Sequence, residues 1–217
     1  MTNELKRYYS LIKERPDEFI QNDNLQIITD EEIIDDYCKQ HNVKIGVIYE
    51  SKYHLLVVDL VKDNKERVFT YERIINTICD ETVMLTLHNG KFVLLNQFRH
   101  ATRNFQYAFS RGFKEVGIFS LDNAKKEMGE EVHTEKSEIS YSLLGKVIAD
   151  SGLNGNVVDV YVARISDNHG KLYANDTKGI IDCIEISEKE FLEMVKNGKI
   201  LDGFTLSAYS LFKSMEV

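Results

Sequence analysis

The sequence predicts an α+β fold. Three observations carry this prediction: strand-like segments dominate residues 43–98, the dipeptide Asn89-Gly90 joins two apolar runs as a hairpin turn does, and a few helix-like segments are inserted between strands. Of the 217 residues, 43% are hydrophobic, which is enough to build one large domain or one domain with an extension.

The first third of the chain predicts two helices followed by three strands. Apolar residues at helical spacing predict a helix over residues 3–14. Thr29 and Glu32 form a capping-box pattern in front of a second helix at about 30–40. The period of the apolar residues then changes to that of strands, which we expect at 43–50, 53–61 and 66–74.

The middle of the chain predicts a hairpin and a helix. The two runs around Asn89-Gly90 give strands within residues 83–98, and alternating aromatic residues at 105–109 indicate a further strand. Ser120 is a candidate N-cap for a helix from about Leu121 to Val132.

The last third predicts three strands and two helices. Ser187 and Glu190 form a capping box for a helix at about 188–197 that Gly198 ends, and a last helix is expected at about 205–213. The strand-like segments before these helices are 139–149, 157–165 and 179–186.

Charge and cysteine content exclude several classes of protein. The formal net charge of −8 argues against nonspecific binding to nucleic acid or to an anionic membrane, because both need basic patches. Cys38, Cys79 and Cys183 are far apart and odd in number, so we expect no disulfide framework and a cytoplasmic location. The N-terminal residues 1–19 have no apolar core of the kind that signal peptides contain.

Three acidic residues lie near the C-terminal end of the helix predicted at 121–132. Glu127, Glu130 and Glu131 have the i, i+3, i+4 spacing that places side chains on one helix face. Their repulsion costs about 0.2–0.5 kcal/mol per i,i+4 pair, and acids near a C-terminus oppose the helix dipole by about 0.3–1 kcal/mol each. Either a cation lies at this face or the face is an ordinary solvated surface, and spacing alone favours the solvated surface.

The stretch GFKEVGIFSLDNAKKEMGEEVHT resembles a Nudix box. The pattern of that family is Gly, five residues, Glu, seven residues, then Arg-Glu-aliphatic-x-Glu-Glu-x-Gly-aliphatic. The flanking segments resemble those of ADP-ribose and nucleotide-sugar pyrophosphatases, and the similarity covers roughly residues 66–215. The positions that match the box are Gly112, Glu127, Met128, Glu130 and Glu131.

The sequence departs from the box at four positions. Ile118 stands where the family has its first Glu, and Lys126 replaces an arginine that orients a glutamate, so a bidentate fork becomes a point charge. His133 and Thr134 replace the final Gly and the aliphatic residue. Histidine tolerates the left-handed conformation better than most residues, so the change at His133 is expected to be mild.

The resemblance implies a metal site on the predicted helix. Glu127, Glu131 and Glu130 would bind Mg²⁺ or Mn²⁺, with a contribution from the main-chain carbonyl of Arg111. Ionised carboxylates are hard oxygen ligands suited to these cations, and a cation at this face would offset the repulsion between the acids. The resemblance also makes Glu130 and Glu131 candidate catalytic residues.

The resemblance further implies residues that meet the substrate. Arg99 matches a position where relatives contact phosphate, and Arg111 lies at the start of the box; guanidinium groups are well matched to phosphate. Relatives carry a glutamate in the loop after the box. Here the loop at 149–156 has no Glu, and Asp150 is the candidate that remains, one methylene shorter.

Taken together, these features predict a Nudix fold, a mixed twisted sheet flanked by helices, in residues 66–217, with an N-terminal extension at 1–65. The expected function is metal-dependent hydrolysis of ADP-ribose or a related nucleotide diphosphate sugar to a nucleoside monophosphate and a sugar phosphate. The alternative is a catalytically impaired module that binds a nucleotide or a protein partner. In relatives the N-terminal strands often form part of a homodimer interface, so the resemblance implies a homodimer through strands 43–74, although these strands could equally pack within one subunit.

Overall fold

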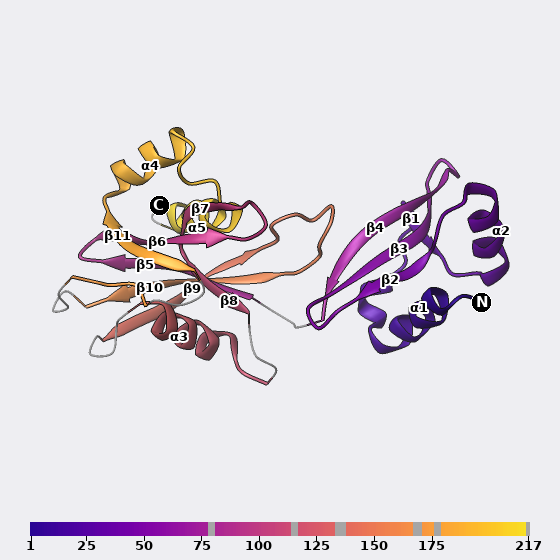
Figure 1. The fold of residues 1–217 in the computed structure, drawn as a ribbon, viewed down its shortest axis with the longest axis horizontal. Coiled ribbons are helices and arrows are strands. Elements are labelled where there is room, and N and C mark those ends of the chain that lie inside the picture. Colours follow the sequence, from indigo (N-terminus) through magenta and orange to yellow (C-terminus); the bar gives the residue numbers. More distant parts are fainter. Residues whose placement is uncertain (78–80, 114–116, 133–137, 167–170, 176–178, 216–217) are drawn as a thin grey trace. The chain divides into compact units, whose positions relative to one another are not determined.

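The structure is a computed structural model that describes residues 1–77, 81–113, 117–132, 138–166, 171–175 and 179–215. Cys79, His133 and Thr134 lie outside these ranges. The chain forms two compact units (Figure 1). The first consists of Met1–Ile78 and Asp150–Asn156, and the second of Cys79–Ala149 and Val157–Val217.

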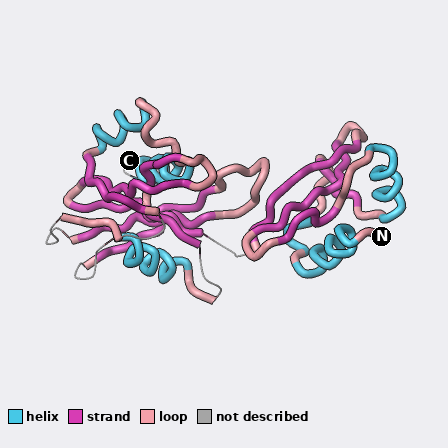
Figure 2. The backbone as a smooth tube through the Cα atoms, in the orientation of Figure 1, coloured by secondary structure: helices cyan, strands magenta, loops and turns pink. Residues whose placement is uncertain are grey.

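The described residues of the first unit form two α-helices and a four-stranded sheet. Figure 2 draws these helices in cyan and the strands in magenta. The helices expected at 3–14 and about 30–40 are present, although Asp30 caps the second one in place of Thr29, accepting from the Glu32 and Ile33 N–H groups. The short strand β1 was not expected. The elements are α1 (Asn3–Glu14), a 3₁₀ helix (Pro16–Phe19), β1 (Leu25–Ile28), α2 (Glu31–His41), β2 (Gly46–Glu50), β3 (His54–Asp63) and β4 (Val68–Asn76).

Strand β3 is the centre of this sheet. β4 pairs with one edge of β3 along most of its length, whereas β1 and β2 each pair with part of the other edge, all antiparallel. The segment Asp150–Asn156 adds to β4, because the Ile74 N–H donates to the Leu153 carbonyl over 2.8 Å. β4 therefore groups with the residues before it, whereas the expected division at residue 65 places it with the residues after it.

A buried polar network links α1 to this sheet. The Tyr8 hydroxyl donates to Asp59 Oδ1, and Arg73 Nε donates to Asp59 Oδ2 over 2.6 Å. The Arg73 guanidinium also lies over the Phe19 ring, 4.7 Å from its centroid. Burial and the negative charge of Asp59 raise the pKa of Tyr8, so its hydroxyl stays protonated and keeps donating. Asp59 is only 2% exposed and therefore depends on these donors.

We expect Tyr8→Phe to lower the free energy of unfolding by about 1–3 kcal/mol, because it removes a donor from a buried carboxylate. Urea unfolding followed by circular dichroism measures the change. Tyr9→Phe is the matched control, since the Tyr9 hydroxyl donates to the Thr29 carbonyl in an exposed setting. Equal losses in the two variants would show that the Tyr8–Asp59 bond adds nothing beyond an ordinary surface hydrogen bond.

The second unit contains a seven-stranded sheet and three helices. The predicted hairpin turn is confirmed, with Asn89 and Gly90 both at positive φ (50° and 72°), as a type I′ turn requires. The capping box of Ser187 and Glu190 is also confirmed. The elements are β5 (Glu81–His88), β6 (Lys91–Arg99), β7 (Asn104–Ala108), β8 (Ser110–Phe113), α3 (Ser120–Glu131), β9 (Ile139–Val147), β10 (Val158–Ile165), β11 (Ile180–Ile186), α4 (Glu188–Lys196) and α5 (Gly203–Met215).

The sheet is mixed, and its two hairpin strands β5 and β6 separate away from their turn. The strand order is β11-β6-β5-β10-β9, with β5 and β10 parallel and the other pairs antiparallel. β5 and β6 pair only near their turn. Further along, β7 pairs with β6 and β8 pairs with β5, so the chain changes from one strand to the other at Phe109.

Helices cover both faces of this sheet. In Figure 1, α3 lies below the sheet, and α4 and α5 lie above it. Alternate residues of β5 face the two layers: Val83 and Leu85 belong to the core that includes Phe212 of α5, and Met84 to the core that includes Met128 of α3. The expected α+β class with a mixed sheet flanked by helices is confirmed for this unit. In the described ranges, no helix combines the length and apolar character that crossing a bilayer requires.

Candidate functional site

Helix α3 carries the acidic residues of the candidate site. It begins at Ser120 and ends at Glu131, close to the expected bounds. Ser120 is the first helical residue, and Phe119 occupies the N-cap position without a side-chain hydrogen bond, so the prediction that Ser120 caps the helix is wrong. Packing holds the helix instead, because Ala124 and Met128 are fully buried against the sheet.

Two carboxylates of α3 are buried against β8. Glu127 is 5% exposed and Glu131 is 2% exposed. The Ser110 hydroxyl donates to Glu131 Oε2 over 2.5 Å. A Cβ atom placed on Gly112 would lie 1.9 Å from Glu127 Cδ, so this carboxylate lies where any side chain at position 112 would project. The two acids of successive helix turns therefore contact the alternate β8 residues Ser110 and Gly112.

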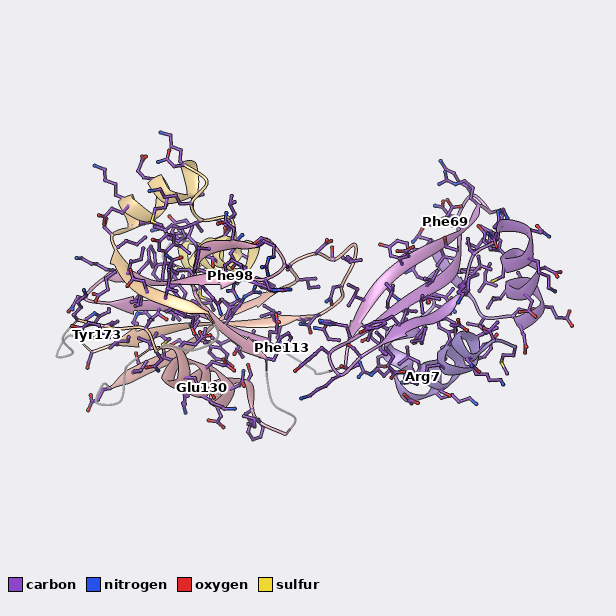
Figure 3. The ribbon with its side chains drawn as sticks, viewed as in Figure 1. Arg7, Phe69, Phe98, Phe113, Glu130 and Tyr173 are labelled. Atoms are coloured by element: carbon purple, nitrogen blue, oxygen red, sulfur yellow. The ribbon has the colours of Figure 1, made fainter. Side chains whose placement is uncertain are left out.

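Glu130 has a different environment. Its side chain is 41% exposed, and its Oε1 lies 3.6 Å from Lys126 Nζ, one turn earlier. Figure 3 shows it on the side of α3 away from the sheet. The three acids thus do not share one environment: Glu127 and Glu131 face the sheet, and Glu130 faces solvent.

Arg99 lies within electrostatic range of Glu131, and Arg111 lies within electrostatic range of Arg99. Arg99 is the last residue of β6, and its buried Nε–H has no hydrogen-bond partner among the described residues. Burial lowers the pKa of Arg99 and the charge of Arg111 lowers it further, whereas Asp202 and Glu131 act in the opposite direction. Two guanidiniums that repel each other, one with an unused buried donor, form an environment suited to an anion.

Arg111 is held by the start of α5. Its Nη2 lies 3.5 Å from Asp202 Oδ1, and its Cζ lies 4.8 Å from the centre of the Phe204 ring. Asp202 in turn accepts from the Thr205 N–H and hydroxyl. Asp202 and Phe204 were not among the predicted site residues, because the last helix was expected to begin at Thr205. The Asp-x-x-Thr pattern is an N-cap signal that would have placed the cap at Asp202 and the helix start two residues earlier, at Gly203.

Two further positions of interest are the loop acid Asp150 and the box position Ile118. Asp150 belongs to the first unit, where its side chain accepts from the Gly152 N–H and its carbonyl from the Asn154 N–H. The structure therefore does not group Asp150 with the acids of α3 within one unit. Ile118, which replaces a glutamate of the box, is half-buried beside the start of α3.

The donor set of α3 suits a hard divalent cation. Among the described residues, no group of three or more His, Cys, Asp or Glu side chains is placed to hold a metal. Magnesium needs no such group, because it is usually bound by one or two carboxylates while waters and substrate phosphates complete its octahedron. The buried pair Glu127 and Glu131 therefore fits Mg²⁺, and an electropositive partner would relieve their mutual repulsion.

Comparisons with known proteins bear on the fold. No protein-family model and no curated protein matches the chain. A crystal structure of an ADP compounds hydrolase matches it with a TM-score of 0.64 and 13% identity, over 80% of this chain and 91% of that one. The chain therefore shares the fold of that hydrolase. At 13% identity the likeness extends to the arrangement of helices and strands, and the site residues have to be argued from their own geometry.

Proposed function

We propose that this protein is a metal-dependent pyrophosphohydrolase that cleaves ADP-ribose or a related nucleotide diphosphate sugar. The observation that carries the proposal is the pairing of two kinds of group in one region. The carboxylates of Glu127 and Glu131 are buried against β8. Arg99, whose buried Nε–H has no partner among the described residues, lies within electrostatic range of Glu131, and Arg111 lies within range of Arg99. Carboxylates that suit Mg²⁺ next to guanidiniums that suit phosphate match a diphosphate substrate with its metal.

Glu127 and Glu131 would hold the metal, with Glu130 and the main-chain carbonyl of Arg111 alongside. When bound, Mg²⁺ or Mn²⁺ supplies a water of lowered pKa and neutralises charge on the diphosphate. The ions are proposed on the chemistry of this donor set. Glu130, Glu131 and Asp150 are the candidate bases that take the proton from the attacking water.

Arg99 and Arg111 would bind the phosphate oxygens and orient the diphosphate. Water adds its oxygen to one phosphorus, the bond from that phosphorus to the bridging oxygen breaks, and the other phosphate leaves. For ADP-ribose the products are AMP and ribose 5-phosphate. The guanidiniums of Arg99 and Arg111 form and break no covalent bond in this reaction, so they contribute through their charge and their position.

We expect Arg99→Ala to raise KM about 10- to 100-fold, because a hydrogen bond to a charged group contributes about 1.5–3 kcal/mol and 1.36 kcal/mol is tenfold. Steady-state kinetics with ADP-ribose measure the effect. Arg103→Ala is the matched control, since the Arg103 guanidinium, in the turn between β6 and β7, contacts His100 and lies over the Phe98 ring. A similar KM in both variants would remove Arg99 from the substrate site.

Two observations favour the alternative, a catalytically impaired Nudix-like module that binds a nucleotide or a protein partner. An aliphatic side chain, Ile118, stands where the family pattern has a carboxylate. The loop at 149–156 has no glutamate, and the shorter Asp150 stands in its place. A module of this kind would keep the arginines and lose the chemistry.

One assay separates the two functions. The purified protein is incubated with Mg²⁺ or Mn²⁺ and ADP-ribose, nucleotide sugars, NADH or diadenosine phosphates, and release of a nucleoside monophosphate is followed. Turnover supports the enzyme. Absence of turnover on every compound, together with metal-independent nucleotide binding, supports the module. The homodimer and the cytoplasmic location stay predictions, which sedimentation and cell fractionation would test.

A further inference from the structure

Helix α3 carries a third buried polar side chain in line with its two buried carboxylates. Asn123 is 0% exposed and lies one turn before Glu127, so that Asn123, Glu127 and Glu131 follow one another on the sheet-facing side. Asn123 Nδ2 lies 3.0 Å from the hydroxyl oxygen of Thr82 on β5. Its Oδ1 is buried and has no hydrogen-bond partner among the described residues, which is unusual for a buried amide.

The register of β5 and β8 places this amide beside Glu127. Thr82 and Gly112 are directly opposite each other in the antiparallel pair. The Asn123 amide contacts Thr82, and the Glu127 carboxylate contacts Gly112. Side chains one helix turn apart that reach two opposite strand residues are neighbours. The Asn123 amide oxygen is thus a buried acceptor without a donor among the described residues, on the same side of α3 as the Glu127 carboxylate.

We propose that Asn123 is a positioning residue for Glu127, and that it completes a relay from Thr82. The Thr82 hydroxyl donates to the Asn123 amide oxygen, and the Asn123 amide nitrogen donates to the Glu127 carboxylate. Rotation of the amide by 180° exchanges its oxygen and nitrogen in the same volume, and a threonine hydroxyl can donate as well as accept. This arrangement satisfies the orphaned amide group and fixes the carboxylate against Gly112.

The relay compensates for two departures from the Nudix box. In the family pattern an arginine orients a glutamate and a further carboxylate helps to support the site, and here Lys126 and Ile118 occupy those two positions. Lys126 lies near Glu130 on the solvent side, 3.6 Å from its Oε1. Asn123 approaches Glu127 from the buried side instead. The inference rests on the proposed function only where it assigns Glu127 to the metal, because the relay itself exists without metal.

The relay is tested in the metal-free protein by a double-mutant cycle of Asn123→Ala and Glu127→Leu, followed by urea unfolding. Each single variant strands one buried partner, whereas the double variant removes both. We expect the double variant to lose less in its unfolding midpoint than the two single variants added together. Additive losses overturn the relay. Thr86→Val with Glu127→Leu is the control cycle, since Thr86 is a buried threonine of β5 bonded to the Met84 carbonyl, and it is expected to be additive.

The positioning role is tested by Mn²⁺ binding, read by electron paramagnetic resonance. We expect Thr82→Val to weaken Mn²⁺ binding about 10- to 100-fold, the usual loss for a group that orients a ligand, and Thr82→Ser to restore it. Thr86→Val should leave the affinity unchanged. Unchanged affinity in Thr82→Val overturns the positioning role. If the wild type binds no Mn²⁺, the proposed function and the positioning role both fail, while the metal-free cycle still decides the relay.

Discussion

Glu131→Gln is expected to lower kcat on the order of a thousandfold, because metal-based stabilisation of a phosphoryl transition state is worth several kcal/mol and each 1.36 kcal/mol is tenfold. The substitution removes the charge and keeps the size of the side chain. The amide oxygen of glutamine can still accept from the Ser110 hydroxyl, which lies 2.5 Å from Glu131 Oε2. We therefore expect the fold to persist, with an unfolding free energy within about 1 kcal/mol of the wild type.

The measurement is the initial rate of AMP release from ADP-ribose at saturating Mg²⁺, with circular dichroism as a check on folding. Asp122→Asn is the matched control, because this substitution also removes one charge from α3, at an exposed position where Asp122 pairs with Lys125. It should leave kcat within a factor of about two. If Glu131→Gln turns over at the rate of Asp122→Asn, the buried carboxylates of α3 have no part in the chemistry.

Gly112→Ala is expected to abolish metal binding and to lower kcat by about a hundredfold or more, the scale of displacing a group that stabilises the transition state. The added methyl group would occupy the position of the Glu127 carboxylate, 1.9 Å from its Cδ. Glu127 would have to leave β8, so the variant should also lose about 1–3 kcal/mol of stability through overpacking. Isothermal titration with Mn²⁺ and urea unfolding measure the two effects.

Gly129→Ala is the matched control for Gly112→Ala, and it is expected to raise stability and to keep metal binding. Gly129 lies in α3, and a Cβ atom there meets nothing within 4 Å. Alanine at an exposed helix position should stabilise the protein by about 0.5–1 kcal/mol and leave Mn²⁺ binding unchanged. If Gly112→Ala binds Mn²⁺ as tightly as Gly129→Ala does, the close approach of Glu127 to Gly112 does not matter to the site.

Local signals predicted the elements that depend on local physics. The hairpin at Asn89-Gly90 is confirmed because only a few residue types adopt positive φ at two successive positions. The α4 cap is confirmed because Ser187 and Glu190 satisfy each other's backbone donors. The caps at Thr29 and Ser120 were wrong. Asp30 is an equally good cap one residue later, and α3 starts without any side-chain cap, since its packing suffices.

The parts that sequence reasoning missed depend on contacts between distant segments. Away from their turn, β5 and β6 pair with β8 and β7 instead of with each other. No local sequence pattern specifies this change of partner. The pairing of β8 with β5 places Ser110 and Gly112 against α3 and the Arg111 side chain toward α5. The acidic run of α3 was found from the sequence, but its division into buried Glu127 and Glu131 and exposed Glu130 required the sheet.

In the proposed site, the buried acids of α3 hold a divalent cation that binds a diphosphate together with Arg99 and Arg111. The most direct test is a crystal structure of the wild type grown with Mn²⁺ and a non-hydrolysable ADP-ribose analogue, with anomalous diffraction data. We expect an anomalous peak within coordination distance of Glu127 and Glu131 and a phosphate oxygen on Arg99. Data that show ordered side chains and bound nucleotide but no anomalous peak at these carboxylates would contradict the claim.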